Sequence, residues 1–152
     1  MQLRILALLA LLPFAAACSS DSTSACTMVG CQSGFTIALQ AATWPAGKYS
    51  VKIVADGVEH RCEASLPIDQ ASPSSCDSDA LMLVVSGSAL PVAQQKLDSV
   101  QVFPIVQDLQ VTISRDGTPL ATQQFVPNYK TTSPNGPECE PTCTQDSATM
   151  TL

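Results

Sequence analysis

Apolar and polar residues alternate with a period of two over several stretches of the chain. Phe35, Ile37 and Leu39 alternate with more polar neighbours, and similar alternation continues through residues 49–55 and 58–64. Successive side chains of a β-strand point to opposite faces of its sheet, so this period is typical of a strand that is buried on one face. These segments therefore predict three half-buried strands.

Two Asp-Gly pairs separate neighbouring alternating segments. Asp56-Gly57 follows the second of the segments above, and Asp116-Gly117 lies between residues 109–114 and 118–126. A two-residue type I′ turn requires positive φ at both central positions, and Asp-Gly is one of the pairs that meet this requirement. Both pairs predict β-hairpins.

The remaining segments differ in how clearly they predict structure. Residues 80–85 are apolar on both faces, which favours a central strand over a short buried helix. Residues 99–103 and 148–152 alternate and predict two further strands, the last of them at a sheet edge. Residues 89–98 fit one helical turn or a crossover, and residues 127–143 are rich in proline, which predicts an irregular loop.

These segments together give seven or eight short strands and no convincing amphipathic helix after residue 17. The expected fold class is all-β, an antiparallel β-sandwich of immunoglobulin-like type. Residues 44–57, WPAGKYSVKIVADG, resemble a strand-and-turn segment of immunoglobulin-like and transthyretin-like modules in secreted bacterial proteins. The resemblance implies the same sandwich architecture.

The first 17 residues have the pattern of an export signal. Arg4 precedes an uncharged apolar run over residues 5–12, which is closed by Pro13 and three small residues. The run is too short to span a bilayer, because a spanning helix needs about 20 apolar residues. An ordinary secretory signal, cleaved after the small residues, would make no use of Cys18.

The segment Ala15-Ala16-Ala17-Cys18 resembles the bacterial lipobox. The resemblance implies cleavage before Cys18 and attachment of a diacylglycerol and an acyl chain to that cysteine. One acyl chain holds a protein at a membrane only marginally, whereas two or three hold it stably. Ser19, in place of an aspartate, resembles the pattern directed to the outer membrane of a two-membrane bacterium. The expected location is therefore a membrane surface, reached through a lipid anchor.

The expected organisation has three parts. Residues 1–17 form the signal, residues 18–33 the lipidated N-terminus and tether, and residues 34–152 the β-sandwich domain. The tether is expected because residues 19–25 are all small or polar. The arrangement of cysteines around the domain also resembles small uncharacterised bacterial lipoproteins, a resemblance that implies no particular activity.

The chain has seven cysteines, an odd number that divides into one lipidated residue and six that can form disulfides. Export favours disulfides over zinc binding at the short spacings Cys26-x4-Cys31 and Cys139-x3-Cys143, although zinc uses similar spacings. Six cysteines allow 15 connectivities, and the sequence does not choose among them. We expect the pairs closest along the chain, Cys26–Cys31, Cys62–Cys76 and Cys139–Cys143.

Composition limits the classes of partner. Hydrophobic residues make up 45% of the chain and charged residues 13%, which is far from the composition of a disordered protein. The formal net charge is −6, and the few basic residues are scattered. Nucleic acids and anionic membrane headgroups need a concentrated basic patch, so neither is an expected partner. The mature chain is long enough for a single domain.

The sequence offers little catalytic chemistry. His60 is the only histidine, and the alternation places it on the same face as Cys62, where a half-buried structural histidine is the favoured interpretation over a catalytic base. Nucleophile-elbow, zinc-protease and phosphate-loop motifs do not occur in the sequence. We therefore expect a non-enzymatic protein without a cofactor.

Two further groups of residues are candidates for binding. Trp44 and Tyr129 lie beside prolines, where an exposed aromatic ring can contact a ligand, although Trp44 can equally cover the end of the core. Asp69, Asp77 and Asp79 could offer oxygen ligands to calcium, but a solvated acidic loop is the favoured interpretation. The expected function is a binding or structural module for an unidentified protein or glycan, with a carbohydrate- or calcium-binding accessory domain as the alternative.

Overall fold

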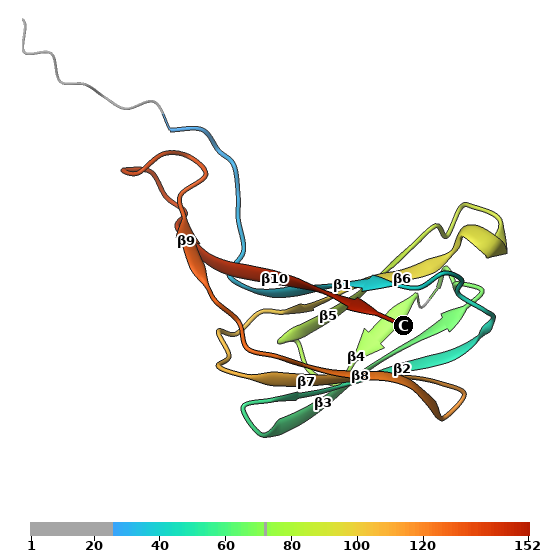
Figure 1. Ribbon diagram of the computed structural model, residues 1–152. Helices are drawn as coiled ribbons and strands as arrows, with labels where there is room; N and C mark the ends of the chain where they lie inside the picture. Colours follow the sequence, from blue (N-terminus) through green and yellow to red (C-terminus); the bar gives the residue numbers. More distant parts are fainter. Residues whose placement is uncertain (1–25, 72) are drawn as a thin grey trace, which may run out of the picture.

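Two five-stranded sheets pack face to face around one hydrophobic core (Figure 1). The computed structural model describes residues 26–71 and 73–152, so the predicted signal, Cys18 and the part of the predicted tether before Cys26 lie outside the described residues. Within the described ranges the one helix is the short 3-10 helix η1 (Val92–Gln94), which agrees with the predicted helical turn. No helix in this part of the chain is long and apolar enough to cross a membrane.

The two sheets have different strand orders. The first sheet has the order β5-β6-β1-β10-β9, with the bounds Leu81–Ser86, Lys96–Val102, Gly34–Gln40, Cys143–Thr151 and Lys130–Thr132. The second sheet has the order β4-β3-β2-β7-β8, with the bounds Ser74–Cys76, Val58–Leu66, Gly47–Ala55, Leu109–Arg115 and Thr118–Phe125.

The connections between the sheets follow the immunoglobulin-like scheme. The chain crosses from the first sheet to the second between β1 and β2 and again between β6 and β7, and β1 lies beside β6 while β2 lies beside β7. Strands B, C, E and F of an immunoglobulin domain have this relationship, and the second sheet has the order of the C″C′CFG sheet of a variable-type domain. The predicted all-β sandwich is confirmed.

One strand departs from this scheme. The last strand, β10, lies beside β1 and runs parallel to it, with Gly34 opposite Gln145 and Gln40 opposite Thr151. In an immunoglobulin domain the first strand occupies that position. The expectation of purely antiparallel pairing is therefore wrong for this pair, and the starts of β1 and β10 lie at the same end of the sandwich.

In the part of the chain that the structure describes, ten strands form where seven or eight were expected. The two additional strands, β4 and β9, are three residues long and carry no alternation that would predict them. The last strand also begins at Cys143 instead of residue 148, because residues 143–145 pair with β9. Sheet pairing extends this strand beyond the segment in which the hydrophobic pattern is visible.

Most of the core consists of the apolar positions that the alternation marks, and Ile68, Leu97 and Val106 join it from outside those segments. The rings of Phe35 and Phe125 approach within 5.8 Å between the sheets, and Tyr49 is fully buried while its hydroxyl donates to the Pro45 carbonyl at 2.7 Å. Both Asp-Gly hairpins are confirmed, with φ of 48° and 83° at Asp56 and Gly57 and of 52° and 81° at Asp116 and Gly117. Positive φ at both central residues defines a type I′ turn.

Candidate functional site

The segment from Cys26 to Ser33, here called the N-terminal arm, is held to the C-terminal part of the chain by two disulfides. Cys26 pairs with Cys139 at a Cα–Cα distance of 5.7 Å, and Cys31 pairs with Cys143 at 6.0 Å. The predicted pairs Cys26–Cys31 and Cys139–Cys143 are wrong, whereas Cys62–Cys76 is confirmed. The parallel pairing of β1 with β10 explains the difference, because it places the residues that precede both strands side by side.

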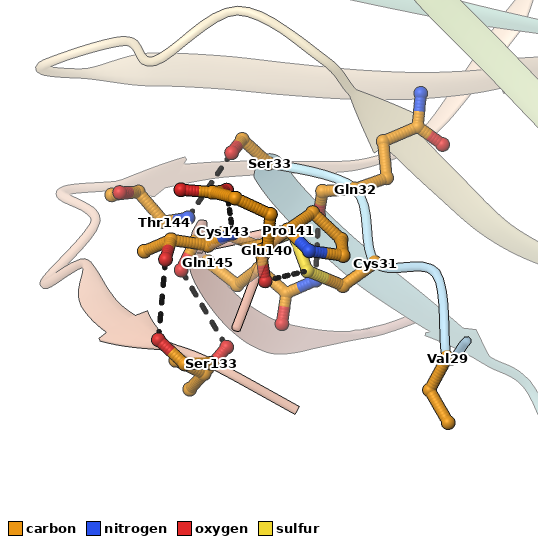
Figure 2. Close-up of a disulfide and its surroundings, with 12 residues drawn as sticks. Val29, Cys31, Gln32, Ser33, Ser133, Glu140, Pro141, Cys143, Thr144 and Gln145 are labelled. Carbon is orange, nitrogen blue, oxygen red and sulfur yellow. Dashed lines mark hydrogen bonds between the residues drawn. A yellow bond between two sulfur atoms is a disulfide. The ribbon is translucent and has the colours of Figure 1, made fainter. Parts of the chain in front are cut away.

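Hydrogen bonds extend the contact between the arm and β10 (Figure 2). The backbone N–H of Thr144 donates to the Ser33 hydroxyl oxygen at 3.1 Å, and the Gln145 side-chain amide donates to the Gln32 carbonyl at 2.6 Å. The Gln32 side chain itself points away from the disulfide (Figure 2). These hydrogen bonds extend the parallel contact between β1 and β10 to the residues that precede Gly34.

Asn135 fixes the distal half of the arm. Its side-chain oxygen accepts hydrogen bonds from the Thr27 hydroxyl at 2.6 Å and from the Val29 backbone N–H at 2.9 Å. Its side-chain nitrogen donates to the backbone carbonyls of Val29 at 2.9 Å and Glu140 at 2.7 Å. Residues 26–33, which were expected to belong to the tether, are thus bonded to the sandwich domain.

A groove with a cavity volume of about 570 Å³ lies on the outer face of the first sheet, where β1 and β10 begin and β6 ends. The first sheet curves at its β9 end, away from the second sheet (Figure 1). We call this site the polar groove, and the side chains that give it its character are Gln32, Thr36, Gln101, Lys130, Gln145 and Ser147. The site combines the arm with four strands of one sheet.

Sheet register explains why these side chains converge. Thr36 lies directly opposite Gln101 of β6 on one side and Ser147 of β10 on the other, so the three share one face of the sheet. That face is the outer one, because the neighbouring residues Phe35 and Ile37 are buried in the core. The result is a row of hydroxyl and amide groups across three strands.

A glycine forms part of the floor of the groove. Gly34 has a φ of 135°, a conformation that other residues rarely adopt, and a Cβ at this position would collide with the carbonyl oxygen of Val102. The missing side chain lets β1 start close to the end of β6.

The two predicted aromatic contacts lie elsewhere and are half-buried instead of exposed. Trp44 packs against the core and meets the ring of Tyr49 edge-on at 5.5 Å, which agrees with a role in covering the end of the core. It also lines a second cavity of about 270 Å³. The Tyr129 hydroxyl accepts a hydrogen bond from the Val106 backbone N–H at 3.1 Å, so this ring packs against the core near the connection between β6 and β7.

His60 is half-buried in β3 and lies beside a carboxylate. Its Nδ1 is 3.5 Å from Oδ1 of Asp77, and the other oxygen of Asp77 accepts a hydrogen bond from the Arg61 backbone N–H at 2.9 Å. The carboxylate therefore also joins the strand β3 to the residue that follows β4. Neither His60 nor Asp77 lines the polar groove.

The three aspartates considered as calcium ligands do not form a cluster. Asp69 accepts a hydrogen bond from the Ala71 backbone N–H at 2.9 Å within its own loop, and Asp77 is engaged with β3 as described. Among the residues that the structure describes, no group of three or more His, Cys, Asp or Glu side chains could hold a metal ion. The structure does not bring Asp79 into such a group either.

The sequence analysis did not identify the polar groove. Thr36 and Gln101 are outward-facing positions of predicted strands, whereas Lys130 and Gln145 lie outside the segments that were predicted as strands. These residues become neighbours only through the register of β6, β1, β10 and β9. Comparison with protein families, with curated proteins and with solved structures finds no match to this chain. The proposal for its function therefore depends on the chemistry of its own residues.

Proposed function

We propose that this protein is an exported lipoprotein, acylated at Cys18 and anchored to a membrane, whose β-sandwich domain binds a glycan without catalysis. The polar groove is the observation that carries the glycan-binding part of the proposal. Its volume of about 570 Å³ lies within the range of about 300 to 1,000 Å³ that is usual for small-molecule sites.

The side chains of the groove match the chemistry of a sugar. Sugar hydroxyls both donate and accept hydrogen bonds, and the amides of Gln32, Gln101 and Gln145 together with the neighbouring hydroxyl groups offer both functions. Phe103 lines the same groove and is partly exposed, and an aromatic ring can provide an apolar surface for the C–H face of a pyranose. Repeated hydroxyl and amide groups along a sheet suit a chain of sugar units.

The groove lacks the pair of acids that hydrolysis of a glycan would need. Canonical glycosidases use two carboxyl groups on opposite sides of the scissile bond. Asp146 is the single carboxylate among the described lining residues, and its two oxygens accept hydrogen bonds from the backbone N–H groups of Asn128 at 2.7 Å and Ser147 at 2.8 Å. This favours binding over hydrolysis.

Export and anchoring are supported by independent features. The three disulfides belong to an oxidising compartment. The resemblance of residues 15–18 to a lipobox supports acylation at Cys18, and Ser19 supports the outer membrane as the destination. Cys26 of the N-terminal arm is bonded to the domain, so the proposed anchor at Cys18 would lie eight positions before an arm that borders the groove.

Glycan binding is tested with the detergent-solubilised, full-length mature protein on a glycan array, followed by titration calorimetry with the best ligand. Gln101→Ala should weaken binding by about fivefold or more, because one or two hydrogen bonds are lost. Gln110→Ala, on the outer face of the second sheet, is the matched control and should leave affinity unchanged. Absence of binding to any glycan, or equal losses in both variants, contradicts the proposal.

The anchor is tested by labelling cells with radioactive palmitate and separating their membranes. The wild-type protein should incorporate label and sediment with the outer membrane, whereas Cys18→Ala should lose the label and leave the membrane fraction. Ser19→Asp should keep the label and move to the inner membrane. A Cys18→Ala protein that is still labelled and membrane-bound contradicts acylation at this residue.

A further inference from the structure

We infer that the glycan bound in the polar groove is acidic, and that the ammonium group of Lys130 binds a carboxylate of its uronic acid units. This inference rests on the proposed function and specifies its ligand class. It begins from the charged groups that line the groove, Lys130 and Asp146.

Lys130 differs from every other basic residue in the described part of the chain. The others each have a carboxylate oxygen within 4.0 Å of a side-chain nitrogen, in the pairs Lys48–Glu63, Lys52–Glu59, Arg61–Glu59, Lys96–Asp98 and Arg115–Asp116. None of the ion pairs between described residues involves Lys130. The chain holds 13 acidic residues against 7 basic ones, so a basic side chain without an acidic partner is unexpected.

The carboxylate in the groove is engaged elsewhere. Both oxygens of Asp146 accept backbone hydrogen bonds, one from Asn128 in the connection between β8 and β9 and one from Ser147 of β10 itself. Hydrogen bonds from N–H groups satisfy the lone pairs of a carboxylate and offset part of its charge. Lys130 is therefore the charged group of the groove that remains free to bind a ligand.

The position of Lys130 suits a ligand that lies along the groove. Lys130 is directly opposite Gln145, which is directly opposite Gly34, so the three form one row across β9, β10 and β1. A sugar bound in the groove beside Gln145 would lie along this row. A carboxylate at the edge of that sugar would then meet the ammonium group on β9 and form a charge-assisted hydrogen bond.

The negative net charge of the protein does not prevent such binding. Exposed charges are largely screened beyond about 8 Å at physiological ionic strength, so distant acidic side chains contribute little at the groove. The local contact with Lys130 decides the selectivity. For the same reason, affinity should fall as salt concentration rises.

The experiment uses the full-length mature protein in detergent and an array that carries uronate-containing glycans, each beside its counterpart with carboxylates reduced to hydroxymethyl groups. Wild-type protein should bind an acidic member at least about tenfold more tightly than its reduced counterpart, as a charge-assisted hydrogen bond allows. Lys130→Gln should remove most of this preference, while Lys130→Arg should keep it. Lys96→Gln changes the net charge equally but removes a lysine that is paired with Asp98, and it should bind as the wild type does.

Each remaining outcome is informative. Equal binding of acidic and reduced glycans, or loss of affinity in both lysine-to-glutamine variants, overturns the role of Lys130 but leaves glycan binding intact. Binding of sulfated glycans in place of uronates overturns the carboxylate assignment. Binding of no glycan overturns this inference and the proposed function together. Thermal melting of each variant within about 2 °C of the wild type, as expected for an exposed side chain, confirms that the fold is unchanged.

Discussion

Cys31 and Cys143 are 112 positions apart in the chain, and a disulfide joins them where β1 and β10 begin. The disulfide between Cys26 and Cys139, with a separation of 113, lies just beyond it. The two bonds therefore close almost the same long loop. Once one of them exists, the other closes only the short ring made of the arm and the loop that faces it.

This nesting predicts a non-additive loss of stability. Removing either disulfide with a pair of Cys→Ala substitutions should lower the free energy of unfolding by about 2–3 kcal/mol, because the other bond still closes the long loop. Removing both should cost roughly 7 kcal/mol, which exceeds the sum of the single losses. Urea denaturation of the three variants measures the difference.

The third disulfide provides the control for that measurement. Cys62 and Cys76 are directly opposite each other in β3 and β4, with a separation of 14. Their removal should cost about 3 kcal/mol, and the cost should nearly add to that of either other bond, because this short loop changes the length of the long loop around it only slightly. Additive losses among all three disulfides would contradict nesting, and so would a peptide map that finds Cys26 bonded to Cys31.

The contrast between these disulfides illustrates what the sequence can predict. Cys62–Cys76 follows from local order along the chain, because the two residues lie on strands joined by one connection. The other two pairs depend on the final strand lying parallel to the first, and hydrophobic alternation within a strand carries no information about its partner or direction. Proximity along the chain is therefore a poor guide where the first and last strands meet.

The same limit applies to the polar groove. Alternation identifies Thr36 and Gln101 as outward-facing, but many other polar residues are outward-facing too. Recognising these two residues as part of a site requires the register that places them opposite each other. It also requires the finding that, among the described residues, every basic side chain except Lys130 has an acidic partner. The fold was accessible from local pattern, whereas the site depends on long-range pairing.

Gly34 offers a test of how the groove floor is built. Gly34→Ala should destabilise the protein by about 3 kcal/mol, because alanine must adopt a φ near 135° and its Cβ meets the Val102 carbonyl oxygen. Gly30→Ala in the arm is the matched control and should change stability by less than about 0.5 kcal/mol, since a Cβ there meets nothing within 4 Å. Thermal denaturation followed by circular dichroism compares the two, and similar melting temperatures would refute the close approach of β1 to β6.

Asp56 and Asp116, the aspartates of the two hairpin turns, each accept hydrogen bonds from backbone N–H groups at the other strand of the pair β2 and β7. Asp116, in the turn after β7, accepts a hydrogen bond from the backbone N–H of Lys48 at the start of β2, at 2.9 Å. Asp56, in the turn after β2, accepts hydrogen bonds from the backbone N–H groups of Gln107 and Asp108 just before β7, at 2.9 and 3.1 Å. The central pair β2 and β7 is therefore held at both ends by a side chain from the opposite strand's turn.

Substitution of these aspartates should separate the role of the side chain from that of the turn. Asp56→Ala should lower the free energy of unfolding by about 2 kcal/mol or more and Asp116→Ala by about 1–2 kcal/mol, because both lose an acceptor at a positive φ and Asp56 serves two N–H groups. The Asn variants keep an acceptor oxygen and tolerate the same φ, so each should stay within about 0.5 kcal/mol of the wild type. The two Ala losses should add in the double variant, since the turns lie at opposite ends of the strand pair. Asn variants as unstable as the Ala variants in urea denaturation would show that the negative charge, and not the hydrogen bond, stabilises these ends.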